Sequence, residues 1–116
     1  MRKLILVLFA ALAVSAFAAD TTVKGYLVDI SCATSPEAQA ADFGAKHSKG
    51  CLQMDDCAKS GYGVLTDDKR VIRFDVAGNA QAKKFIADLK KTKDLKVNVT
   101  GAVNGESMTV SKIELQ

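Results

Sequence analysis

The stretch LKVNVTGAVNGESMTVSKIEL, residues 95–115, decides the fold. Apolar and polar residues alternate on both sides of Asn104-Gly105, and this period of two is typical of strands with one buried face. Asn-Gly between two such runs is a strong signal of a β-hairpin, because both residues accept the positive φ angles of a tight turn. The stretch therefore predicts two antiparallel strands.

A second hairpin is predicted upstream, at residues 61–75 (GYGVLTDDKRVIRFD). Two apolar runs flank the polar turn TDDKR there, which is a common hairpin pattern. The β-branched and aromatic residues of TVKGYLVDIS, residues 22–31, predict one further strand. The chain is therefore expected to contain five strands.

A helix is expected between the two hairpins, over about residues 80–91. Asn79 is a suitable N-cap, because its side chain can accept a hydrogen bond from a free amide of the first turn. Apolar residues then recur at i, i+3, i+4 and i+7, which places them on one face of the helix. They are Ala82, Phe85, Ile86 and Leu89.

The order of these elements predicts a mainly β, α+β domain, namely a five-stranded OB-like barrel with its helix between the third and fourth strands. Residues 32–60 carry the cysteines and lack any period of two. They are therefore expected to form a helical or loop insertion after the first strand. Within the insertion, Ser35 and Gly44 mark the ends of one predicted helix, and residues 51–59 suggest a second.

The first 18 residues are typical of a secretory signal peptide. Two cations precede an apolar run and the small-residue pattern Ala16-Phe17-Ala18. We expect cleavage near Ala18, a single domain over residues 19–116, and a periplasmic or secreted location without an integral membrane span. The formal charge of +3 includes Arg2 and Lys3, so it falls to +1 without them. This charge is too small for a nucleic-acid-binding protein.

The candidate functional residues are three cysteines and the sole histidine. HSKGCLQMDDC, residues 47–57, holds two of the cysteines, and one more lies upstream. Thiolates and an imidazole are the ligands of tetrahedral zinc sites and also suit copper, for which Met54 offers an extra thioether. The sequence therefore predicts a zinc or copper site formed by Cys32, His47, Cys51 and Cys57.

Other interpretations of the same residues stay open. Exported thiols tend to pair, so Cys32 could form a structural disulfide with Cys51 or Cys57. The barrel could then serve as a ligand-binding module for an oligosaccharide, peptide or protein partner, with Tyr26 and Tyr62 on its face. No catalytic motif is present, so the protein is predicted not to be an enzyme. Thiol or redox chemistry is the minor alternative.

The chain resembles a family of small secreted bacterial proteins of unknown function. The matching pieces are GYLVDISC (25–32), His47, Cys51, CAKSGYGVL (57–65), FDVAGNAQAKKFI (74–86) and LKVNVTGAVNGESMTVSKIEL (95–115). Together they contain a Cys…His…Cys…Cys core. The resemblance implies a compact β-barrel outside the cytoplasm. It implies no activity.

Overall fold

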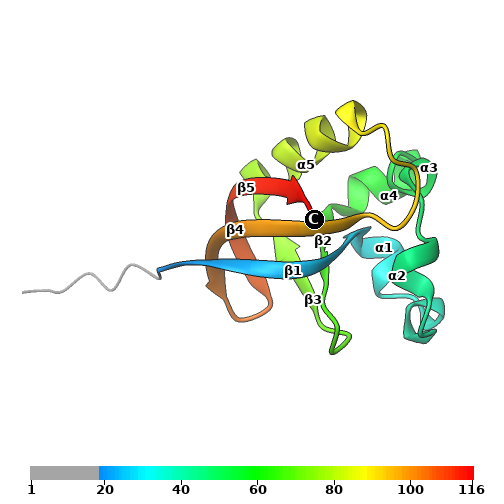
Figure 1. Ribbon diagram of the computed structural model, residues 1–116, viewed down its shortest axis with the longest axis horizontal. Coiled ribbons are helices and arrows are strands. Elements are labelled where there is room, and N and C mark those ends of the chain that lie inside the picture. Colours follow the sequence, from blue (N-terminus) through cyan, green and yellow to red (C-terminus); the bar gives the residue numbers. More distant parts are fainter. Residues whose placement is uncertain (1–18) are drawn as a thin grey trace, which may run out of the picture.

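The computed structural model describes residues 19–116, so the predicted signal peptide lies outside the described residues. Five strands close into a barrel in the order β1-β2-β3-β5-β4, with β4 pairing back onto β1 (Figure 1). The prediction of a mainly β fold with five strands is confirmed. The strands are β1 (Asp20–Asp29), β2 (Tyr62–Leu65), β3 (Val71–Phe74), β4 (Lys96–Asn104) and β5 (Ser107–Leu115).

Both predicted hairpins form. In the β4–β5 hairpin, Asn104 pairs with Ser107 across a turn in which Gly105 has a φ of 62°. β2 and β3 pair antiparallel around the polar turn, and β3 meets β5 in parallel. The alternation of residues 95–115 places one face of this hairpin inside the barrel. Its buried side chains are Leu95, Val97, Val99, Met108 and Val110.

Helix α5 (Val76–Asp88) lies between β3 and β4, where the sequence predicts a helix, but it begins earlier than residue 80. Its N-cap is Asp75, whose carboxylate accepts a hydrogen bond from the Gly78 amide at 2.8 Å. The predicted cap, Asn79, instead accepts a hydrogen bond from the Tyr62 amide at 2.9 Å. Asp75 follows β3 directly, so it starts the helix before Asn79 is reached.

Five short helices connect β1 with β2 and gather beside the end of β1 (Figure 1). They are α1 (Ile30–Ala33), η1 (Pro36–Gln39), α2 (Phe43–Lys46), α3 (Lys49–Leu52) and α4 (Asp55–Ser60). Within residues 19–116, no helix has the length and apolar character that a membrane crossing requires.

The two helices predicted in this connection are each divided. The first consists of η1 and α2, and Gly44 lies inside α2 instead of ending a helix. Gly44 is required there by packing, since a Cβ atom would overlap the ring of Tyr26. The second is split into α3 and α4 at residues 53–54. Cys51 and Cys57 therefore lie on different helices.

Gly101, the glycine of β4, should not tolerate a larger residue. It sits at an irregularity in the β4–β5 register, where a Cβ atom would overlap the Thr109 carbonyl oxygen. We expect Gly101→Ala to lower the free energy of unfolding by about 1–3 kcal/mol, as overpacking does. Urea unfolding would measure this, with Gly50→Ala as control, since its Cβ would meet no atom closer than Ser48 Oγ at 3.7 Å. Equal stability of the two variants would contradict the register.

Candidate metal site

Asp29 is the centre of the candidate site. It is the last residue of β1 and its side chain is completely buried. Its carboxylate caps α1 by accepting a hydrogen bond from the Cys32 amide at 2.9 Å. The second carboxylate oxygen lies 2.7 Å from His47 Nε2. Because an ionised carboxylate can only accept, the imidazole N–H donates in this bond.

Two cysteine sulfurs lie beside this carboxylate. Cys32 is carried by α1 and Cys57 by α4, and their Sγ atoms are 3.9 Å apart. One hydrogen bond joins the two helices, since the Ser31 amide donates to Ser60 Oγ at 3.0 Å. Within α4, Ser60 Oγ in turn donates to the Cys57 carbonyl at 2.6 Å. The contact between α1 and α4 therefore brings the two cysteines together.

Asp29, Cys32 and Cys57 form a group of potential metal ligands. One donor atom from each lies within 4.8 Å of the others. Two thiolates at about 2.3 Å from a tetrahedral zinc ion are about 3.8 Å apart. The observed sulfur separation of 3.9 Å is close to this value. The group could hold a metal ion without rearrangement of the helices.

Burial governs the protonation of the group. Burial raises the pKa of the Cys32 thiol to about 12, and the nearby Asp29 charge adds to the shift. Burial also raises the pKa of Cys57, again with a contribution from Asp29. For Asp29 itself, burial raises the pKa, but hydrogen bonds from His47 and the Cys32 amide outweigh it and leave the pKa below its ordinary value. Without a metal, the site is a carboxylate beside two thiols.

His47 and Cys51, the other two predicted ligands, lie outside this group. His47 follows α2, is buried, and stacks against Phe43 with ring centroids 5.1 Å apart. Its link to the group is the hydrogen bond to Asp29. Cys51 lies on α3, where its Sγ accepts a hydrogen bond from Ser48 Oγ at 3.3 Å. His47 and Cys51 both line a separate pocket of about 220 Å³.

Asp29 is the site residue that the sequence analysis missed. One local signal could have identified it, because Asp three residues before Cys32 has the spacing of an N-cap and the amide it binds. The residue that it contacts through its other oxygen, His47, is 18 positions away. No local pattern predicts that contact.

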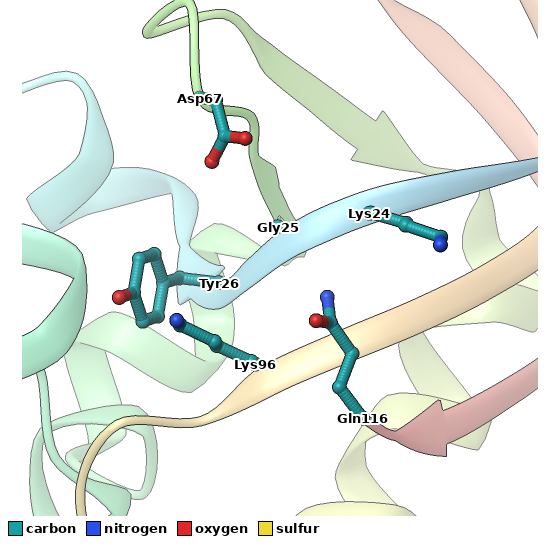
Figure 2. Close-up of a pocket in the computed structure, with 6 residues that line it drawn as sticks. All are labelled: Lys24, Gly25, Tyr26, Asp67, Lys96 and Gln116. Atoms are coloured by element: carbon teal, nitrogen blue, oxygen red, sulfur yellow. The ribbon is translucent and has the colours of Figure 1, made fainter.

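Tyr26 and Tyr62 do not form a shared exposed face, as the ligand-binding interpretation requires. Tyr62 is buried, with its hydroxyl donating to the Leu52 carbonyl at 3.0 Å. Tyr26 is half-buried and faces a small pocket of about 150 Å³, where the Lys96 amino group lies 5.7 Å from its ring centroid (Figure 2).

Comparisons of the chain with known protein families, curated proteins and solved structures gave no match.

Proposed function

We propose that this protein binds one zinc ion through Asp29, Cys32 and Cys57. The observation that carries the proposal is the 3.9 Å separation of the two sulfurs beside a buried carboxylate. A zinc ion would bind both sulfurs as thiolates, and it would offset the desolvation that keeps them protonated without it. The ion would also balance the buried Asp29 charge.

The donor set favours zinc over copper. Zinc accepts both thiolate and carboxylate ligands, whereas Cu(I) prefers an all-sulfur set. The thioether that would complete such a set belongs to Met54, which is 59% exposed. We therefore keep copper as the weaker competitor for the same group.

His47 is proposed as the outer partner of the metal ligands. A hydrogen bond from His47 fixes the orientation of the Asp29 carboxylate, in the way that partners of metal ligands usually do. Three protein ligands leave the fourth tetrahedral position to water or another small ligand.

We further propose that the protein is exported and non-catalytic, and that it has an OB-like barrel. These are the properties that the sequence predicts, together with membership of the small secreted family that it resembles. The strand order and the place of α5 between β3 and β4 support the OB-like fold.

The test is a titration of the reduced protein with zinc and, as a spectroscopic probe, with cobalt(II). We expect one equivalent to bind and two thiolates to contribute charge-transfer absorption in the cobalt form. Cys32→Ser and Cys57→Ser should each weaken zinc binding by more than the ~100-fold that the loss of an outer partner costs. Cys51→Ser is the matched control and should leave binding unchanged.

Two results would contradict the proposal. One is the absence of stoichiometric zinc binding by the reduced protein. The other is an equal loss of affinity in Cys51→Ser and Cys32→Ser, which would mean that Cys51 is a ligand. His47→Ala separates the proposed role of His47 from direct ligation, because it should weaken binding by about 10–100-fold with the cobalt spectrum retained at saturation.

A further inference from the structure

We infer that Cys32 and Cys57 exchange the metal ion for a disulfide when they meet a low-molecular-weight disulfide, and that Cys32 reacts first. The inference rests on the proposed zinc site and adds its regulation. It assigns Cys32 as a site of mixed-disulfide formation and Cys57 as the thiol that resolves it.

The two sulfurs are close enough for both states. A disulfide bond is about 2.05 Å long, so the sulfurs at 3.9 Å must approach by about 1.9 Å. A change of χ1 moves a cysteine sulfur further than this. The helices that carry Cys32 and Cys57 are already joined by the hydrogen bond from the Ser31 amide to Ser60 Oγ. Oxidation therefore needs side-chain movement and leaves the helix contact in place.

The order of reaction follows from exposure. Cys32 is half-buried, whereas Cys57 is 7% exposed. A disulfide in solution can reach the Cys32 sulfur more readily, because attack requires the sulfurs to be in line and accessible. Cys57 is the more buried of the pair and its sulfur is 3.9 Å from that of Cys32, so we assign it as the resolving thiol.

The step balances as a thiol–disulfide exchange. In the zinc form both sulfurs are thiolates. The Cys32 thiolate attacks one sulfur of the small disulfide, which forms a mixed disulfide and releases one small thiolate. The Cys57 thiolate then attacks Cys32 Sγ, which forms the Cys32–Cys57 bond and releases the second small thiolate. Two electrons pass from the protein sulfurs to the small disulfide, and the zinc ion leaves with both thiolate ligands lost.

The rest of the site tolerates loss of the ion. The Asp29 carboxylate keeps its hydrogen bonds from the Cys32 amide and from His47. Removal of the ion therefore does not leave the buried carboxylate without partners.

The experiment uses zinc-loaded protein in a Cys51→Ser background, so that only the pair can react. Oxidised glutathione is added, zinc release is followed with a chromophoric indicator, and intact mass is measured without reductant. We expect one equivalent of zinc to be released and two hydrogens to be lost, with no lasting adduct. A phosphine reductant should restore zinc binding.

Single-thiol variants test the order in the metal-free state, because loss of either sulfur should weaken zinc binding. With Cys57→Ser added, a glutathione adduct should persist on Cys32. With Cys32→Ser added instead, Cys57 should form its adduct at least ~10-fold more slowly, because access limits the rate. Equal rates would overturn the assigned order.

The outcomes also separate this inference from the zinc site itself. Zinc binding that survives excess oxidised glutathione, or adducts that never give way to a disulfide, would overturn the exchange and leave the proposed zinc site standing. A reduced protein that binds no zinc would overturn both.

Discussion

Leu52→Ala is expected to lower the free energy of unfolding by about 2–5 kcal/mol, the range for buried Leu to Ala changes. Leu52 belongs to α3, in the segment between β1 and β2, yet its side chain is fully buried in the main hydrophobic core. Its carbonyl also accepts a hydrogen bond from the hydroxyl of Tyr62, which lies in β2. Truncation would leave a cavity where the helical segment is joined to the barrel.

Urea unfolding of the two proteins measures this effect. Met54→Ala is the control, because Met54 lies two residues away and is 59% exposed, so the change should stay within about 0.5 kcal/mol. If both variants unfold at the same urea concentration, the segment does not depend on Leu52 for its attachment to the barrel.

Leu52 also illustrates where sequence analysis reaches its limit. A single leucine among polar residues has no periodicity, so nothing in residues 47–57 marks it as core. The hairpin over residues 95–115 was predictable because its information is local, with alternation in the strands and Asn-Gly at the turn. The start of α5 was less predictable, because Asp75 and Asn79 are both good caps and only the fold decides which is used.

The site shows the same division between local and distant information. Residue chemistry alone identified Cys32 and Cys57 as candidates, and the structure brings their sulfurs together. His47 and Cys51 are four residues apart, a spacing that places two residues on one face only where both belong to the same helix. Here α2 ends at Lys46 and a new helix begins at Lys49. A spacing argument holds only within one helix.

Contacts between distant segments carry no sequence signature. Asp29 meets His47 because the end of β1 lies beside the loop after α2. Asp29 also reaches Cys57, which lies 28 positions further along the chain. A carboxylate at a strand end is usually exposed, and the structure alone reveals this one as buried.

Asp29→Ala is expected to be the most damaging single change at the site. It removes the N-cap of α1, which contributes about 1 kcal/mol. It also leaves the buried His47 N–H without its acceptor, which costs about 1–3 kcal/mol. We therefore expect the metal-free protein to lose about 2–4 kcal/mol of unfolding free energy, together with its zinc binding.

Asp29→Asn separates these two losses. The asparagine side-chain oxygen can still accept a hydrogen bond from His47 or from the Cys32 amide, so most of the stability should remain. A neutral amide, however, neither compensates the charge of a zinc ion nor binds it as a carboxylate does. Near-normal urea unfolding with zinc affinity reduced more than ~100-fold, beyond the loss of an outer partner, would place the carboxylate in the metal site. If Asp29→Asn binds zinc as tightly as the unaltered protein, Asp29 is a structural cap and the two sulfurs must bind the ion with other ligands.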